Sequence, residues 1–128
     1  MSRGFLQFRK NVSTSSAGSP YLQALRDRVL VFDGAMGTSI QGYDLTAEDF
    51  GGQHLHGCND YLVVTRPDVI EEIHRGFLEA GCDVLETDTF RSNRITLGEY
   101  GLGDQVREVN LAAVAVARRS ASTPRKPG

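Results

Sequence analysis

Two apolar segments, each followed by small and polar residues, most constrain how this chain can fold. Residues 29–32 are an unbroken apolar run that leads into Asp33, and residues 83–87 form a comparable segment that leads into Phe90. Short apolar runs of this length are typical of strands that are buried on both faces, as in parallel sheets. We therefore predict two buried β-strands, each ending in a polar mouth.

Helical patterns separate and follow these segments. Pro67 suits the first turn of a helix, with Asp68 favourable to the dipole and Thr65 a possible cap, and Gly81 ends the helix. Its apolar residues share one face, while His74 is expected among the solvent-facing residues. The apolar face consists of Val69, Ile70, Ile73, Phe77 and Leu78.

A second helix is predicted after Gly103, and a short one from Tyr21. One face of the second helix carries Val106, Val109, Ala113, Val116 and Ala117. The order strand, helix, strand, helix predicts an α/β fold with right-handed parallel crossovers. Two strands cannot complete such a sheet, and the chain ends where a third would be due. We therefore expect the N-terminal part, about two βα units, of a larger fold.

Composition excludes several classes of function. The 128 residues are 40% hydrophobic and 23% charged with a net charge of −2, which gives no reason to invoke nucleic acid or a membrane as partner. No apolar run reaches the roughly 18 residues that span a bilayer. Cys58 and Cys82 make no disulfide framework and fit a reducing compartment, so we predict a cytoplasmic chain. A single disulfide between them stays an alternative.

The first 20 residues differ from the rest of the chain. They contain Arg3, Arg9 and Lys10 with a Ser-rich stretch, and no acid precedes Asp27. We predict a disordered extension over residues 1–20 and a folded domain over residues 21–128. An organellar transit peptide or a misplaced start codon are the alternatives.

The ends of the two predicted strands carry the residues best suited to bind a ligand. Asp33 precedes Gly34 to Thr38, and Glu86 precedes Thr87 to Phe90. In parallel α/β folds ligands bind beyond the carboxyl ends of the strands. Backbone N–H groups near the glycines suit a carboxylate or phosphate, and an ionised Asp33 suits an ammonium group, so an amino acid is a candidate ligand. A simple Asp-Gly turn is the alternative.

Residues 39–66 form a long Gly-punctuated stretch that is expected to be a loop. Loops of this length inside a compact unit are more often functional than idle. His54, His56, Cys58 and Asp60 lie within it, but their spacing matches no closed zinc site. We therefore predict no metal site in this chain and no catalytic residue set.

Four segments of the chain, taken in order and with their spacing, resemble those of a known family. They are Phe32-Asp33-Gly34-Ala35-Met36-Gly37-Thr38, Cys58-Asn59-Asp60-Tyr61-Leu62, Pro67-Asp68-Val69-Ile70 and Glu86-Thr87-Asp88-Thr89-Phe90. Together they resemble the homocysteine S-methyltransferase family. Within that family the segment at Asn59 resembles the homocysteine-binding module of the cobalamin-dependent methionine synthases.

This resemblance implies a (β/α)8 TIM barrel with the site at its carboxyl-end mouth. It implies methyl transfer to the homocysteine thiol, giving methionine, with zinc activating the thiol and methylcobalamin donating the methyl group. Methyltetrahydrofolate recharges the cobalamin on other modules. The substrate-binding role falls on Asp33, Gly34, Ala35, Thr87 and Thr89.

The family's zinc ligands are three cysteines on later strands, and neither Cys58 nor Cys82 falls at such a position. We therefore expect a fragment that carries part of the substrate pocket, no zinc ligand and no activity on its own. The alternative is a small amino-acid-binding or regulatory remnant that associates with other barrel subunits.

Overall fold

The computed structural model describes residues 18–123. The described chain divides into two compact units, with the boundary between Leu30 and Val31. The predicted extension over residues 1–20 lies almost wholly outside the described residues. In the first unit, α2 (Pro20–Asp27) confirms the short helix expected from Tyr21, and none of its residues is buried.

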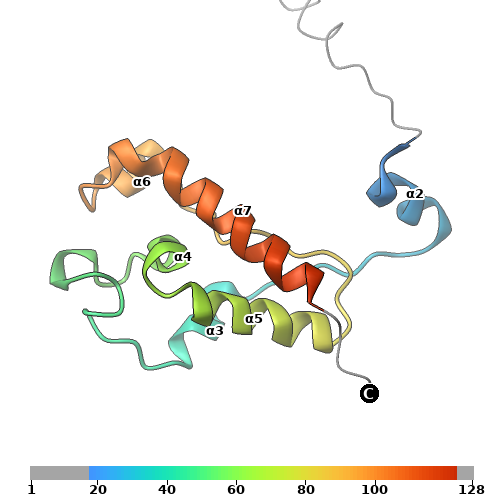
Figure 1. Ribbon diagram of the computed structural model, residues 1–128, viewed down its shortest axis with the longest axis horizontal. Coiled ribbons are helices and arrows are strands. Elements are labelled where there is room, and N and C mark those ends of the chain that lie inside the picture. The colour runs from blue at the N-terminus through green and yellow to red at the C-terminus, as the bar shows by residue number, and fades with distance from the viewer. Residues whose placement is uncertain (1–17, 124–128) are drawn as a thin grey trace, which may run out of the picture. The chain divides into compact units, whose positions relative to one another are not determined.

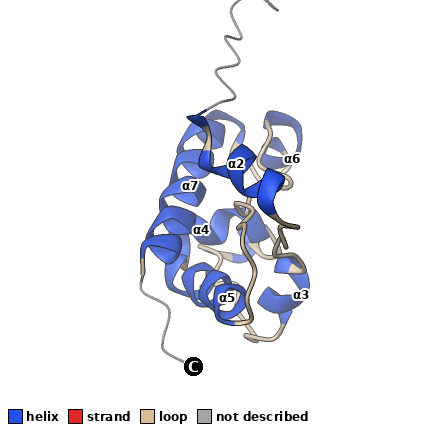
Figure 2. Ribbon diagram, turned by 90° about the vertical axis from the view of Figure 1, so that its right-hand side faces the viewer, coloured by secondary structure: helices blue, strands red, loops and turns tan. Residues whose placement is uncertain are grey.

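The second unit is built from helices and single helical turns (Figures 1 and 2). The α-helices among its described residues are α3 (Met36–Gln41), α4 (Leu62–Thr65), α5 (Pro67–Glu79), α6 (Arg94–Gly98) and α7 (Val106–Ser122). Three 3-10 turns lie between them: η2 (Gln53–Leu55), η3 (Asn59–Tyr61) and η4 (Gly103–Gln105).

The core of this unit lies where α5 and α7 run side by side (Figure 1). Ile70 of α5 and Val109 and Ala113 of α7 are completely buried. The apolar faces that the sequence pattern predicts for α5 and α7 therefore point into the core. Leu62 and Val63 of α4 extend the same core. Phe77 and Val106 are partly buried against it.

The two predicted strands are present only as one isolated parallel bridge, between Phe32 and Val84. The N–H of Asp33 donates to the carbonyl of Val84 at 3.0 Å, and the N–H of Asp83 donates to the carbonyl of Val31 at 2.7 Å. The Asp83 carboxylate also accepts from the Val31 N–H at 3.0 Å. The parallel pairing of the two segments is thus observed, but no regular strand forms among the described residues. Two paired segments without further neighbours give only a marginal sheet.

The prediction that residues 29–32 are buried on both faces is wrong. Val29 is 85% exposed, Val31 56% and Phe32 46%. An apolar run is buried in a sheet only when other strands and helices cover it, and the bridge supplies one neighbour.

Three local predictions also need correction. Residues 36–41, expected in the polar mouth and the following loop, form α3, and α4 lies within the predicted long loop. Thr65 does not cap α5; its hydroxyl lies 3.5 Å from the Tyr61 carbonyl, and Arg66 takes the cap position. His74, expected in solvent, is completely buried because it lies one turn after Ile70 on the inner face of α5.

Gly81 ends α5 as predicted, through a Schellman motif. Its φ is +104°, and its N–H donates to Leu78 while the N–H of Cys82 donates to Phe77. An L-residue with a side chain is strained at such a φ.

Replacing Gly81 with alanine is therefore expected to lower the free energy of unfolding by about 1–2 kcal/mol. Gly76, inside α5, is the matched control: a Cβ there meets nothing within 4 Å. Gly76→Ala is expected to stabilise by about 1 kcal/mol, because alanine favours the helix. Urea unfolding of both variants tests this, and equal effects at the two positions would contradict the strain at Gly81.

No helix of residues 18–123 is both long and apolar enough to cross a membrane.

Candidate functional site

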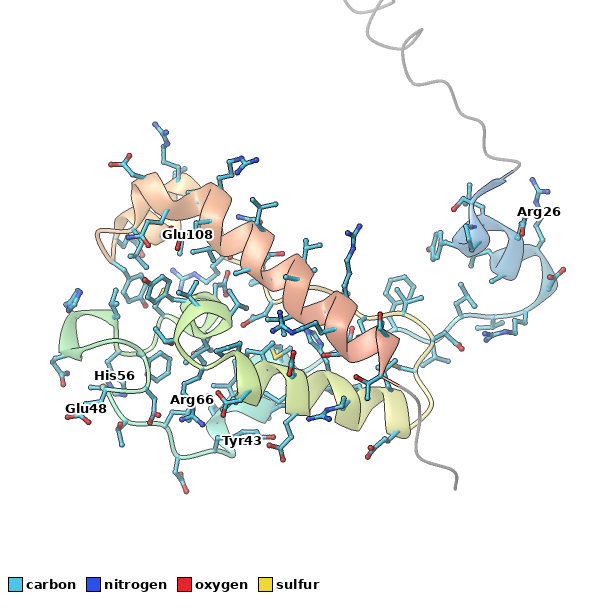
Figure 3. The ribbon with its side chains drawn as sticks, viewed as in Figure 1. Arg26, Tyr43, Glu48, His56, Arg66 and Glu108 are labelled. Carbon is cyan, nitrogen blue, oxygen red and sulfur yellow. The ribbon has the colours of Figure 1, made fainter. Side chains whose placement is uncertain are left out.

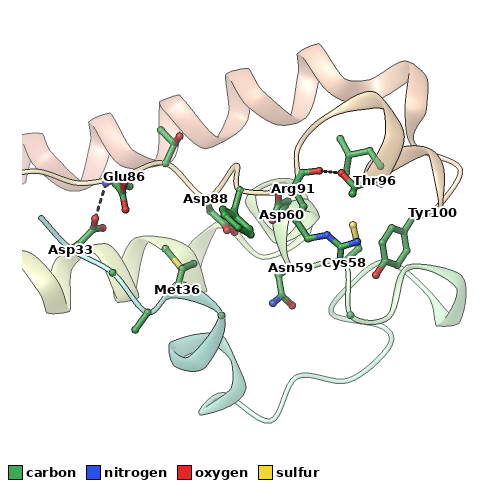
Figure 4. A pocket seen from close by; sticks show the side chains of 17 residues that line it. Asp33, Met36, Cys58, Asn59, Asp60, Glu86, Asp88, Arg91, Thr96 and Tyr100 are labelled. Carbon is green, nitrogen blue, oxygen red and sulfur yellow. Dashed lines mark hydrogen bonds between the residues drawn. The ribbon is translucent and has the colours of Figure 1, made fainter.

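A pocket of about 320 Å³ lies where three segments of the second unit meet (Figure 4). The first segment follows the parallel bridge, the second leads into η3 and includes its first residues, and the third runs from the bridge into α6. The residues that line the pocket include Asp33, Gly34, Ala35, Cys58, Asp60, Thr87, Asp88 and Arg91.

The first wall turns sharply into α3. Ala35, the residue before this helix, has φ 49° and ψ 33°, a left-handed conformation that is uncommon for a residue other than glycine. The turn redirects the chain directly after Asp33. Gly34 lines the pocket beside it, and a Cβ at Gly34 meets nothing within 4 Å. The backbone of this wall is therefore open toward the pocket.

The Asp33 carboxylate is held at the junction between the first and third segments. One oxygen, Oδ1, accepts from the N–H of Glu86 at 2.8 Å (Figure 4). The other, Oδ2, lies 3.6 Å from Nδ1 of His74. The Asp33 side chain is 4% exposed. Asp33 therefore links segments that are 53 residues apart in the sequence while it lines the pocket.

Of the two threonines predicted for the site, Thr87 lines the pocket and Thr89 does not. Their hydroxyl oxygens lie 2.8 Å apart, so one donates to the other. Thr89 therefore contacts the pocket through Thr87.

Two acidic side chains, Asp60 and Asp88, form the inner part of the pocket. Asp60 Oδ2 accepts from the backbone N–H of Arg91 and from the hydroxyl of Ser92, both at 2.7 Å. Asp88 is 6% exposed, and its Oδ2 has no hydrogen-bond partner. Burial, with the nearby charge of Asp60, raises the pKa of Asp88 to about 7. Asp88 is thus a carboxyl group that is partly protonated near neutral pH.

Cys58 is a buried thiol in the pocket wall. Burial raises its pKa, so the thiol stays protonated at neutral pH. Neither Cys58 nor Cys82 forms a disulfide. The described residues contain no group of three or more His, Cys, Asp or Glu side chains that could hold a metal. The set of His54, His56, Cys58 and Asp60 is therefore not assembled as a metal centre.

Arg66 anchors the long stretch over residues 39–66, of which it is the last residue (Figure 3). Its guanidinium forms ion pairs with Asp49 in that stretch and with Asp68 in the first turn of α5. The hydrogen bond from Arg66 lowers the pKa of Asp68. One arginine thus ties the stretch to the start of α5.

The structure brings four of the five predicted substrate-binding residues to one pocket: Asp33, Gly34, Ala35 and Thr87. The sequence interpretation considered Asp60 only as a metal ligand, did not single out Asp88, and placed His74, the histidine behind Asp33, among the solvent-facing residues. Helical spacing from Ile70 could have placed His74 inside. No sequence signal identifies the environment of Asp88, because Asp60 lies 28 residues earlier in the chain.

Comparisons with known proteins agree on one family. The homocysteine S-methyltransferase family profile matches residues 30–126. Methionine synthase of Mycobacterium tuberculosis (strain ATCC 25618 / H37Rv) is 51% identical over 100 residues, which cover 78% of this chain and 8% of that protein. Methionine synthase of Mycobacterium leprae (strain TN) is 49% identical over 100 residues, with the same coverage. The chain thus spans 8% of the length of these relatives. It belongs to the homocysteine S-methyltransferase family.

Proposed function

We propose that this chain binds the amino-acid end of homocysteine, as the homocysteine-binding part of a cobalamin-dependent methionine synthase. The reaction of the whole enzyme would be methyl transfer to the homocysteine thiol, giving methionine. The observation that carries the proposal is that Asp33 to Gly37 and Glu86 to Asp88 line the same pocket. These residues lie in two of the segments by which the sequence resembles the family. The proposed fold of the whole domain is a TIM barrel, of which this chain supplies the first part.

The chemistry of the pocket suits the ammonium group of an amino acid. Asp33 lies in it as a carboxylate whose Oδ1 already accepts one N–H. A substrate ammonium beside this carboxylate gains a charge-assisted hydrogen bond, which is about twice as strong as a neutral one. The backbone of Gly34 and Ala35 forms the adjoining wall, where N–H groups are proposed to bind the substrate carboxylate. Thr87, with Thr89 behind it, is proposed to orient the substrate.

The family implies zinc at the thiol and cobalamin as methyl carrier, and the described residues do not fit the zinc. They hold no group of three candidate ligands, and the pocket thiol of Cys58 is kept protonated by burial. The described residues of this chain are therefore not the ones that would hold zinc at the thiol. Zinc binding, the cobalamin and the methyltetrahydrofolate modules are proposed for segments of the full-length enzymes that this chain does not span. Two cysteines that form no disulfide support the proposal of a cytoplasmic location.

Asp33→Asn tests the proposal. The substitution keeps an oxygen that can accept from the Glu86 N–H but removes the charge that pairs with the ammonium. Loss of this contact is worth about 1.5–3 kcal/mol, so homocysteine affinity is expected to fall at least about tenfold. NMR titration of the 128-residue chain with L-homocysteine at millimolar concentration measures it.

Two controls make the result specific. Asp104→Asn removes the same charge at an exposed position in η4, outside the pocket, and is expected to leave binding unchanged. The ligand 4-mercaptobutyrate lacks the ammonium group, so its binding is expected to be insensitive to Asp33→Asn. Equal homocysteine affinity in the wild type and in Asp33→Asn, or no binding by the wild type, would overturn the proposal.

A further inference from the structure

His74 is a buried polar side chain without a hydrogen-bond partner. It lies in the middle of α5, is completely buried, and neither Nδ1 nor Nε2 makes a hydrogen bond. Buried polar side chains usually have at least one partner, and one without a partner calls for an explanation. An apolar residue in its place would meet no such penalty, so packing alone does not account for an imidazole here.

The nearest charged partner of this imidazole is the pocket carboxylate Asp33. His74 Nδ1 lies 3.6 Å from Asp33 Oδ2, and both side chains are shielded from solvent, with exposures of 0% and 4%. A separation of 3.6 Å is a few tenths of an ångström longer than a hydrogen bond. Such contacts in ligand-free sites often tighten when the ligand binds. Because Oδ1 of Asp33 already accepts from Glu86, Oδ2 is the oxygen whose orientation is still unfixed.

Burial keeps the imidazole of His74 neutral, against the acidic side chains around it. Burial lowers its pKa, and this effect outweighs the opposing effects of Asp33 and of Glu71 on the same helix. Glu71 is itself paired with Arg119 of α7. Helices α3 and α4 also pack against α5, and neither of them carries a titratable side chain. At neutral pH, therefore, His74 leaves the negative charge of Asp33 uncompensated, and that charge is available to a ligand.

We propose that His74 is a positioning residue for substrate binding: its Nδ1–H holds Oδ2 of Asp33 so that the carboxylate presents its charge to the ammonium group of the bound amino acid. With donors on both oxygens, from Glu86 and His74, the plane of the carboxylate is fixed. The proposal rests on the proposed function, in which Asp33 binds that ammonium group. A protonated His74 would neutralise Asp33 and repel the ammonium, so affinity falls as the imidazole is protonated on acidification.

Two substitutions separate positioning from packing. His74→Asn keeps an N–H donor close to the position of Nδ1 but does not titrate, and His74→Leu keeps similar volume without a donor. His74→Leu is expected to weaken homocysteine binding at least about tenfold, without effect on 4-mercaptobutyrate. His74→Asn is expected to bind within about threefold of the wild type at pH 7.5. His54→Asn, in η2 outside the pocket, is the matched control with wild-type behaviour.

The pH profile gives a readout that a purely structural role would not change. Homocysteine affinity of the wild type is expected to fall between pH 7.5 and 5 more steeply than that of His74→Asn. Asp88, with a pKa of about 7, titrates in the same window in both proteins, so the difference between the two profiles is the measured quantity. Identical profiles would overturn the proposal even if His74→Leu does not fold.

The outcomes distinguish this inference from the proposed function. If Asp33→Asn binds homocysteine as the wild type does, the role of Asp33 fails and the role of His74 fails with it. If Asp33→Asn weakens binding and folded His74→Leu does not, only the role of His74 is refuted. Loss of binding in His74→Leu with recovery in His74→Asn supports the positioning role.

Discussion

Asp88→Asn is expected to stabilise the folded chain at pH 8 by as much as about 4 kcal/mol. The pKa of Asp88 is raised by burial from 3.8 to about 7, and one pKa unit corresponds to about 1.4 kcal/mol. With a raised pKa, the folded state binds the proton more tightly than the unfolded state. The contribution of the neutral carboxyl is therefore fully present below about pH 4 and is lost as pH rises through 7. Asparagine stays neutral throughout and avoids that loss.

Urea unfolding at pH 4, 6 and 8 measures this effect as a difference curve. The two proteins are expected to have similar stability at pH 4 and to diverge as pH rises, while titrating groups that do not interact with Asp88 cancel in the difference. Asp104→Asn, at an exposed position, is the control and is expected to change stability by no more than about 0.5 kcal/mol. A parallel pair of stability curves for the wild type and Asp88→Asn would show that Asp88 is ionised in the fold at little cost.

Ile70→Ala is expected to lower the free energy of unfolding by about 2–5 kcal/mol. Ile70 is completely buried where α5 meets α7, so the shorter side chain leaves a cavity between these helices. Domains are stabilised by only about 5–15 kcal/mol in total, so this is a large fraction.

Ile95→Ala is the matched control, because Ile95 is 81% exposed in the first turn of α6. The same change of side chain there is expected to shift stability by no more than about 0.5 kcal/mol. Thermal and urea unfolding of both variants test the comparison. Similar losses at the two positions would mean that the interface between α5 and α7 is not the core of the unit.

The helices that carry the core were predictable because their sequence pattern is local. In α5, Val69, Ile70 and Ile73 repeat at helical spacing, Pro67 begins the helix, and Gly81 follows its end. All of these signals lie within 15 residues, and tertiary contacts did not override them.

The two strands were not predictable in the same way, because a strand depends on neighbours far along the chain. The apolar run before Asp33 indicates a buried strand only if a sheet surrounds it, and here it meets a single bridge at Val84. Helix α3 was missed because Gly37 within it suggests a turn, and short helices carry little periodic signal. The local sequence pattern thus predicted the long helices correctly. It failed for the strands, whose formation depends on pairing with distant segments.

At the site, residue identity misled where spacing was informative. His74 was assigned to solvent together with the charged residues around it, although it follows Ile70 by four residues and so shares the buried face. For Asp33 the prediction of a pocket position rested on its place after an apolar run, and the structure places it in the pocket wall. The buried acid Asp88 depends on how distant segments fold over it, which no local pattern encodes.

The single bridge between Phe32 and Val84 has a consequence for the thermodynamics of the pocket. The wall residue Asp33 follows Phe32 directly, and Glu86 lies two residues after Val84, so opening of the bridge would separate the walls. A ligand that contacts both walls binds only the closed form and therefore draws the equilibrium toward it. At a ligand concentration one hundred times the dissociation constant, this linkage amounts to about 2.7 kcal/mol. Occupancy of the pocket and formation of the bridge are thus linked, and any ligand that contacts both walls stabilises the pairing of these two segments.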